Sequence, residues 1–299
     1  MKKNILLASA LVLISLFSCG TNSTSEPNIS LTSTVAPSQT QTTVKPQKLD
    51  PIVTKQTAAI KKESFASVTN GPLPYRLYTP SNYDGDTYHY PVFIFLHGAG
   101  ERGNDNSLQL KNAVQNLYND LNSPLYQSIA IFPQCPPENN TSDSDLNQWV
   151  DTPWAKGNYS VDNVPESNDL KAVLQILETI KSTFSVNEKR IYVMGLSMGG
   201  FGTWDLIMRH TELFAGAIPV CGGADTAYAS KLVNMPIHTI HCANDNVVPY
   251  TGTKAMVEAI KGAGGNKITY EQLSGYGHNV WDYASTKAGL MNWLFSQSL

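Results

Sequence analysis

The sequence predicts an α/β fold, with a mostly parallel central sheet covered by helices on both faces. Two observations lead to this prediction. From Tyr90 onward, short apolar runs alternate with segments whose apolar residues recur at helical spacing, which is typical of parallel strands joined by helices. The run Tyr90–Leu96 is also apolar throughout, as expected for a strand buried on both faces. About 240 of the 299 residues belong to this one domain, predicted at 59–299.

Residues 1–18 have the composition of a signal peptide. Lys2 and Lys3 form a basic start, and the apolar or small stretch 5–17 is too short for a stable membrane-spanning helix. The segment that ends in Ser18 and Cys19 resembles the lipobox of bacterial lipoproteins, in which the cysteine becomes the lipidated first residue. We therefore expect export and a lipid anchor at Cys19 in the bacterial cell envelope. An ordinary signal peptide cleaved nearby is the alternative, and it also implies export.

Residues 19–58 are expected to form a flexible tether between this anchor and the folded domain. From Thr21 to about Lys48 the chain is rich in Ser, Thr, Pro, Asn and Gln, with almost no large apolar residue. Such a segment cannot bury a core.

Charge and cysteine content narrow the classes of partner and cofactor. The formal charge is −3 and no basic stripe is present, so nucleic acid is not an expected partner. Cys135, Cys221 and Cys242 match no zinc-binding spacing, and neither a metal nor a cofactor is expected. In an exported chain, these cysteines form either one disulfide with a free thiol or three buried thiols. The sequence carries no signal for the oligomeric state.

Two strand-like runs are expected to form a hairpin at the start of the domain. They cover Ser64 to Thr69 and Leu73 to Tyr78, and they flank Asn70-Gly71, a dipeptide that favours tight turns. Because proline cannot donate a hydrogen bond to a neighbouring strand, Pro72 and Pro74 predict that the second run lies at a sheet edge.

Strands and helices are then expected in alternation, around a long irregular region. Beyond Tyr90–Leu96, strands are predicted at 128–133, 191–196, 214–220, 236–241 and 267–273, and helices at about 107–121, 169–183, 198–208, 253–261 and 283–295. A loop as long as 134–166 is usually functional or disordered, and its tryptophans argue against disorder.

The turn at Ser197 is the first sign of chemistry. Gly195, Ser197 and Gly199 form the pattern G-x-S-x-G between a predicted strand and a predicted helix. This is the nucleophile elbow of α/β-hydrolases, a strained turn that exposes the serine hydroxyl above the sheet. Side chains at the two glycine positions would collide with the crossing strand and helix.

A nucleophilic serine needs a base and a third group that orients the base. In α/β-hydrolases these follow the serine in the order acid, then histidine. Asp245 and His278 each follow a predicted strand, and open α/β sheets build their sites at the carboxyl ends of strands. We therefore predict Ser197, His278 and Asp245 as nucleophile, base and orienting acid. Asp225 stays open as the second choice for the acid.

Other acids and histidines downstream of Ser197 are weaker candidates. Asp205 lies in the helix after Ser197 and is expected to be a solvated or capping charge, and Asp282 is a further acid. His210, His238 and His241 are alternative bases. The last two lie in an apolar strand, where a hydrogen-bonded core histidine is expected.

Acyl transfer also needs N–H donors for the developing oxyanion. The backbone N–H of Met198, directly after the nucleophile, is one expected donor. The other is expected from the small-residue loop after Leu96, with Ala99 as the first choice and Gly100 as the second.

Several motifs together resemble one branch of the α/β-hydrolases. They are His97-Gly-Ala-Gly-Glu-Arg-Gly103, Pro133-Gln-Cys-Pro136, Gly195-Leu-Ser-Met-Gly-Gly-Phe-Gly-Thr-Trp204, Asp245-x-x-Val-Pro249 and Gly277-His278-x-x-Trp281. This set is similar to the exported esterases often called predicted peptidases, which are related to carbohydrate esterase family 1, feruloyl esterases and polyhydroxyalkanoate depolymerases. The resemblance implies a metal-independent serine esterase. Cys242 departs from the glycine that such sequences often carry.

Substrate preference is less marked in the sequence. Trp149, Trp154, Tyr250 and Trp281 are candidates for lining an acyl or sugar subsite. No insertion between Asp245 and His278 is long enough for a lid or large cap domain, which favours an open cleft and a bulky ester. We expect hydrolysis of feruloyl or acetyl esters on polysaccharides. The alternatives are a serine peptidase of the same fold and a glycan-binding surface lipoprotein without turnover.

Overall fold

The computed structural model describes residues 48–53, 56, 64–137, 148–153 and 156–299. The predicted signal peptide, Cys19 and most of the predicted tether lie outside the described residues. The strands are β1 (Ala66–Val68), β2 (Tyr75–Tyr78), β3 (Tyr90–Leu96), β4 (Ile129–Pro133), β5 (Val186–Leu196), β6 (Gly216–Val220), β7 (Ile237–Cys242) and β8 (Ile268–Leu273). The α-helices are α1 (Val114–Leu117), α2 (Asn168–Thr183), α3 (Met198–Arg209), α4 (Tyr250–Gly262), α5 (Trp281–Thr286) and α6 (Leu290–Phe295).

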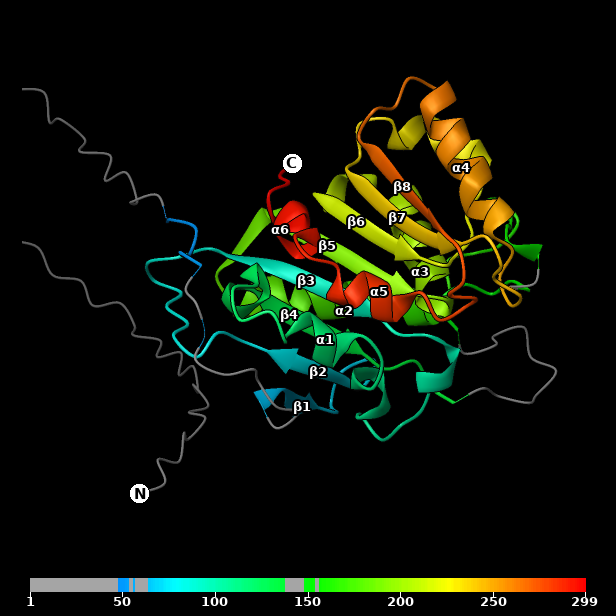
Figure 1. Ribbon diagram of the computed structural model, residues 1–299. Helices are drawn as coiled ribbons and strands as arrows, with labels where there is room; N and C mark the ends of the chain where they lie inside the picture. The colour runs from blue at the N-terminus through cyan, green and yellow to red at the C-terminus, as the bar shows by residue number, and fades with distance from the viewer. Residues whose placement is uncertain (1–47, 54–55, 57–63, 138–147, 154–155) are drawn as a thin grey trace, which may run out of the picture. The chain divides into compact units, whose positions relative to one another are not determined.

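These strands form one sheet with the order β1-β2-β4-β3-β5-β6-β7-β8 (Figure 1). Strands β4, β3, β5, β6, β7 and β8 are parallel to one another, whereas β2 runs antiparallel to both β1 and β4. Because the central strands are parallel, their carboxyl ends, and the loops that follow, meet at one edge of the sheet. The sheet with its crossover helices is the predicted α/β-hydrolase fold.

The two faces of the sheet bury different sets of side chains. Along β3, Val92, Ile94 and Leu96 belong to one buried cluster, whereas Phe93 and Phe95 belong to the other. This alternation follows from the two-residue period of a strand. The first cluster also contains apolar residues of α2, α3 and α4, and the second contains residues of α1, α5 and α6. Both faces are therefore covered, as predicted.

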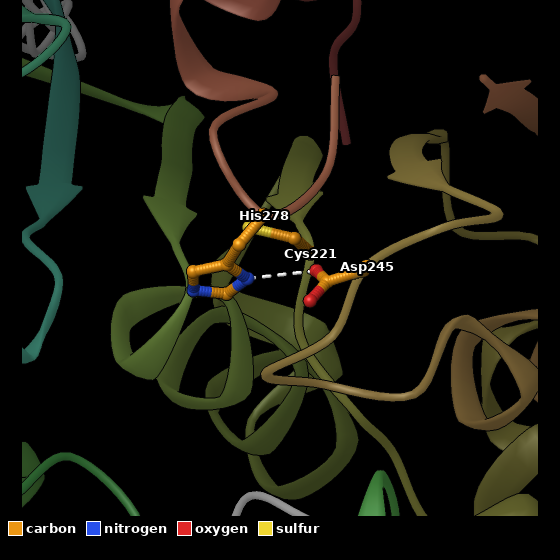
Figure 2. Close-up of side chains that lie close together, drawn as sticks. All are labelled: Cys221, Asp245 and His278. Atoms are coloured by element: carbon orange, nitrogen blue, oxygen red, sulfur yellow. Dashed lines mark hydrogen bonds and ion pairs between the residues drawn. The ribbon is translucent and has the colours of Figure 1, made fainter. Parts of the chain in front are cut away.

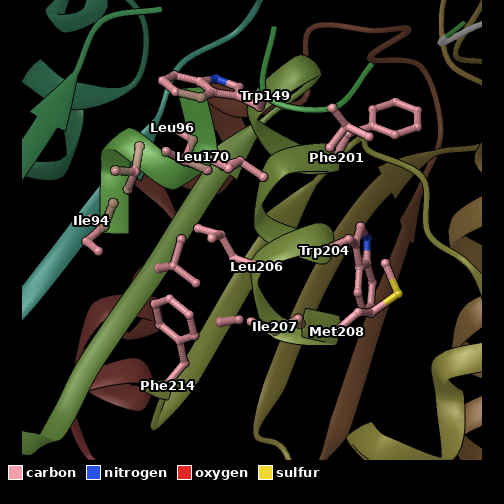
Figure 3. Close-up of a cluster of buried hydrophobic side chains, with 14 of the residues drawn as sticks. Ile94, Leu96, Trp149, Leu170, Phe201, Trp204, Leu206, Ile207, Met208 and Phe214 are labelled. Atoms are coloured by element: carbon pink, nitrogen blue, oxygen red, sulfur yellow. The ribbon is translucent and has the colours of Figure 1, made fainter. Parts of the chain in front are cut away.

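Helix α3 is buried along its whole circumference. Every residue of α3 from Met198 to Met208 is buried, and Figure 3 shows Phe201, Trp204 and Met208 on one side of the helix and Leu206 on the other. A helix that is apolar on all sides needs partners on all sides. α3 contacts β3, β5 and β6 as well as the 3₁₀-helix Thr226–Leu232, so the element that begins at Ser197 is held firmly.

Three predicted elements differ from the structure. β2 does not lie at the edge, since it pairs with both β1 and β4. Pro72 and Pro74 precede the paired residues of β2, so neither proline has to donate a hydrogen bond to the sheet.

The other two differences are interrupted helices. The helix predicted at 107–121 is a 3₁₀ turn followed by α1, and Ala113 before α1 has a φ of 63°, a left-handed conformation that a helix interior does not allow. The last helix is divided into α5 and α6 by Gly289, which has a φ of 78°.

The start of the described chain is attached to the folded unit, Gln47–Leu299. Leu49 exchanges backbone hydrogen bonds of 3.1 Å and 2.9 Å with Thr87 and His89, and Asp50 forms an ion pair of 3.1 Å with Arg190. These residues, which fall within the predicted tether, therefore pack on the folded unit. No helix among the described residues is long and apolar enough to cross a membrane.

Candidate active site

The turn between β5 and α3 has the geometry expected of a nucleophile elbow. Ser197 has a φ of 54°, a strained conformation for a residue with a side chain. A Cβ on Gly195 would lie 2.2 Å from the carbonyl oxygen of Gly199, and a Cβ on Gly199 would lie 2.0 Å from that of Leu96. The prediction that both positions require glycine is confirmed, because helix α3 and strand β3 pass this close to the turn.

Ser197, His278 and Asp245 form a continuous chain of hydrogen bonds. The Oγ of Ser197 lies 2.8 Å from Nε2 of His278, and Nδ1 of His278 lies 2.7 Å from Oδ2 of Asp245. Asp245 follows β7, and His278 lies in the loop between β8 and α5. Because a carboxylate only accepts, the proton of His278 is on Nδ1, and Nε2 is free to accept the Ser197 proton. Figure 2 shows the bond between Asp245 and His278.

The Asp245 carboxylate is covered completely and is held by four donors. Its Oδ1 accepts the backbone N–H groups of Val247 and Val248 at 2.8 Å and 2.9 Å, and its Oδ2 accepts from His278 and, at 3.2 Å, from Nε2 of His241. Burial alone would raise the pKa of the Asp245 carboxyl, but these hydrogen bonds outweigh burial and hold the pKa well below its ordinary value. Asp245 is therefore an anion beside the base.

The Asp225 carboxylate, the second candidate for the orienting acid, accepts hydrogen bonds from the backbone of two loops. Its Oδ2 accepts the backbone N–H of Val161 at 2.8 Å, and its Oδ1 accepts that of Ala227 at 3.0 Å, where it caps a 3₁₀-helix. These bonds join two loops of the fold. The geometry therefore favours Asp245 over Asp225 as the partner of His278.

The remaining acids have other surroundings. Asp205 was expected to be solvated or capping, but it is buried and paired with Arg209 at 2.7 Å, and it accepts the hydroxyl of Tyr159 at 2.7 Å. It ties α3 to the long loop that precedes α2. Asp282 is exposed in the first turn of α5.

The alternative bases are hydrogen-bonded away from Ser197. His210 pairs with Glu166 at 2.7 Å, and His238 pairs with Glu271. His241 is a core histidine as expected, and its Nδ1 lies 2.8 Å from Oγ1 of Thr253. The contact of His241 with Asp245 was not predicted from the sequence, although the two residues are only four positions apart at the end of β7.

The loop after β3 lies against the elbow and is fixed by His97. The Nδ1 of His97 donates to the carbonyl of Gly98 at 2.6 Å, and its Nε2 accepts the backbone N–H of Cys135 at 3.0 Å. Burial is the main cause that lowers the pKa of His97 from its ordinary 6.5 to about 4. His97 is therefore neutral, and the neutral ring can both donate from Nδ1 and accept at Nε2, as these two hydrogen bonds require.

The two predicted donors to the oxyanion, the backbone N–H groups of Met198 and Ala99, each lie at the start of a helix. Met198 is the first residue of α3, and Ala99 is the first residue of a 3₁₀-helix, Ala99–Glu101. The first N–H groups of a helix have no acceptor within it. The close approach of Gly199 to Leu96 and His97 brings these two segments together.

The four predicted substrate-contacting aromatic residues have different positions. Trp149 is fully buried, and its Nε1 donates to the carbonyl of His97 at 2.9 Å, so it supports the loop rather than lining an open cleft. Trp281 lies edge-on to His278 with 5.4 Å between ring centroids. Tyr250 is half-buried at the start of α4. Trp154 lies outside the described residues.

The three cysteines of the folded unit, Cys135, Cys221 and Cys242, are free thiols, and all are buried. Of the two expected arrangements, the structure therefore has three buried thiols and not a disulfide with one free thiol. Among the described residues, one group of three side chains offers ligand atoms close enough to hold a metal ion: Cys221, Asp245 and His278. Cys221 was not predicted from the sequence to lie near the site. Its place after the apolar run of β6, at the carboxyl edge of the sheet, was the signal for its position near the site.

Comparison with known proteins gives the family. The model of a family described as phospholipase/carboxylesterase matches residues 83–288. The chain belongs to this family. Two curated relatives match locally: a bifunctional acetylxylan esterase/xylanase from Neocallimastix patriciarum, 32% identical over 89 residues, and a poly(3-hydroxyalkanoate) depolymerase C from Paucimonas lemoignei, 36% identical over 52 residues. The matches cover 29% and 17% of this chain, but each covers only 13% of the relative.

Solved structures of other proteins share the fold. A thermostable esterase is 31% identical with a TM-score of 0.65, over 79% of this chain and 64% of that chain. An acetyl xylan esterase from Aspergillus awamori is 13% identical with a TM-score of 0.54, over 77% of this chain and 99% of that one. The second likeness concerns the fold alone.

We predict that His97 makes the folded unit less stable in acid. The unfolded chain binds a proton at His97 below pH 6.5, whereas the folded chain does so only below about 4. Stability therefore falls as the pH drops through this window, by about 2 to 3 kcal/mol at pH 4.5. Urea unfolding at pH 7.5 and pH 4.5 measures the loss. In His97→Gln the loss should be smaller by about this amount, and equal losses in both proteins would contradict the prediction.

Proposed function

We propose that this chain is a serine carboxylic ester hydrolase that acts through an acyl-Ser197 intermediate. The observation that carries the proposal is the hydrogen-bond chain from Ser197 through His278 to Asp245, with distances of 2.8 Å and 2.7 Å. Membership of the phospholipase/carboxylesterase family supports the same reaction class.

The proposed mechanism follows from the positions of two protons, one on Nδ1 of His278 and one on Oγ of Ser197. His278 Nε2 takes the Ser197 proton as Oγ attacks the ester carbonyl, and Asp245 stabilises the imidazolium that forms. The N–H groups of Met198 and Ala99 donate to the oxyanion. His278 then protonates the departing alcohol, and a water molecule activated by the same nitrogen hydrolyses the acyl-enzyme. No step in this sequence requires a metal or cofactor.

The proposed substrates are feruloyl or acetyl esters of polysaccharides. Support comes from the relatives, one of which is named an acetylxylan esterase. Further support comes from the segment between Asp245 and His278, which consists mainly of α4 and β8 and has no insertion that could close over Ser197. Trp281, beside His278, is the aromatic side chain best placed to contact the acyl group or sugar.

We also propose that the protein is exported and anchored in the cell envelope through a lipid on Cys19. This proposal rests on the sequence of residues 1–19. An anchored esterase with a tether fits an insoluble or polymeric substrate, which cannot diffuse to the enzyme.

Hydrolysis of a small substrate panel tests the proposed function. The protein would begin at Gln47, the first residue of the compact unit, and the panel would contain p-nitrophenyl acetate, methyl ferulate, acetylated xylan and a peptide anilide. We expect ester turnover that Ser197→Ala lowers by about 10⁴-fold or more, since no other group replaces the nucleophile. Cleavage of the anilide without ester turnover would favour a peptidase, and binding of xylan without any turnover would contradict the proposal.

A matched pair of variants tests the assignment of the acid. Asp245→Asn should lower kcat on p-nitrophenyl acetate by about 10³- to 10⁴-fold, because the amide no longer orients and stabilises protonated His278. Asp225→Asn keeps one acceptor oxygen and loses one of its two bonds to the backbone N–H groups of Val161 and Ala227. This change should lower the stability of the fold, but kcat should stay within about threefold of that of the unchanged protein. Circular dichroism would show that both variants are folded. The reverse order of the two effects would refute the assignment.

A further inference from the structure

Cys221 is an unexpected neighbour of the proposed catalytic residues. It follows β6 directly, is fully buried, and has a φ of 42°. That backbone conformation is uncommon for a residue with a side chain, and strained residues of this kind gather at functional sites.

The thiol lies within coordination range of two other ligands. The Sγ of Cys221, a carboxylate oxygen of Asp245 and a ring nitrogen of His278 all lie within 4.8 Å of one another. Figure 2 shows the Cys221 side chain directed toward the pair formed by Asp245 and His278. The three residues come from three separate loops at the carboxyl edge of the sheet.

The chemistry of this set suits a borderline-soft divalent cation. Thiolate, imidazole and carboxylate are the ligands that Zn²⁺ prefers, with bonds of about 2.0 to 2.3 Å. Ligand atoms around a tetrahedral ion stand about 3.5 Å apart. Nδ1 of His278 and Oδ2 of Asp245, which are 2.7 Å apart, would therefore have to separate to admit the ion, and the Cys221 thiol, within 4.8 Å of both residues' ligand atoms, would have to approach them. Hard cations such as Mg²⁺ prefer oxygen ligands and fit poorly here.

We propose that Cys221, Asp245 and His278 form an inhibitory site for Zn²⁺ or a similar thiophilic divalent cation. The effect on activity rests on the proposed function, whereas the binding itself does not. On binding, the Cys221 thiol gives its proton to water and the sulfur coordinates as thiolate. Oxygen from Asp245 and nitrogen from His278 supply two further bonds, and a water molecule fills the fourth position.

Inhibition follows from the position of the His278 proton. Nδ1 is the nitrogen that faces Asp245, so a cation between these residues takes Nδ1 and displaces its proton. The proton that leaves Nδ1 passes through water to Nε2, so the imidazole stays neutral, with the metal on Nδ1 and the proton on Nε2. Nε2 then donates to Ser197 and can no longer accept the serine proton, so the first step of the reaction is blocked.

The Cys221 thiol is fully buried, which disfavours its oxidation or alkylation in the absence of metal. A cation compensates for the cost of burying the thiolate. Of the three residues, His278 is the one whose side chain is partly exposed.

Two variants and two readouts test this site. Zn²⁺ should inhibit hydrolysis of p-nitrophenyl acetate, and Cys221→Ser and Cys221→Gly should raise the inhibitory concentration by at least about 100-fold, each measured relative to its own activity without metal. Cys242→Ser is the matched control, because Cys242 is also a buried free thiol outside the group of three, and it should leave the inhibitory concentration unchanged.

A spectroscopic readout separates this proposal from the proposed function. Co²⁺ bound by a thiolate gives a charge-transfer band in the near ultraviolet, and Ser197→Ala removes the nucleophile without removing a ligand. We expect the band in Ser197→Ala and in the unchanged protein, and its loss in Cys221→Ser. Equal inhibition of Cys221→Ser, or a missing cobalt band in folded Ser197→Ala, would overturn the site. Absence of ester turnover without metal would instead count against the proposed function.

Discussion

The tight turn at Ser197 is the constraint on which the rest of the site depends. A φ of 54° at this residue is maintained because β5 is locked between β3 and β6, and because α3 is buried on all sides. The two glycines allow the backbones of β3 and α3 to approach within a distance that any Cβ would prevent. The strain of the turn is therefore balanced by the packing of the most buried helix in the described chain. The hydroxyl is presented where the loops after β7 and β8 can reach it.

Asp245 is the electrostatic centre of this edge of the sheet. Its carboxylate is fully covered, yet donors from two histidines and two backbone N–H groups keep it ionised. A buried anion of this kind stabilises a neighbouring cation strongly, because the surrounding dielectric is low. The Asp245 anion would stabilise protonated His278 during turnover, and it would likewise stabilise a divalent cation bound next to Cys221. The proposed catalytic and inhibitory roles thus arise from one charge.

The sequence was sufficient for the parts of the structure that depend on repeating patterns. The alternation of apolar runs predicted the parallel strands, and G-x-S-x-G predicted the elbow with its two glycines, because both follow from backbone geometry. Asp245 and His278 could be predicted as neighbours since parallel strands bring their carboxyl ends together.

Features decided by single residues or by tertiary contacts could not be predicted in this way. Ala113 interrupts a helix-like segment with a left-handed conformation that its own side chain does not favour, so packing must impose it. Trp149 was expected at the substrate, but its indole N–H bonds His97 in the core. Cys221 is 24 residues from Ser197 and 57 from His278 in the chain, and only the assembled sheet edge brings the three together.

Active-site labelling tests the central claim most directly. A fluorophosphonate reacts with an activated serine and forms a stable covalent adduct, and peptide mass spectrometry identifies the labelled residue. The account predicts one adduct on Ser197, with labelling slowed by about 10³-fold or more in His278→Ala. Labelling of a different serine, or equal rates with and without His278, would contradict it.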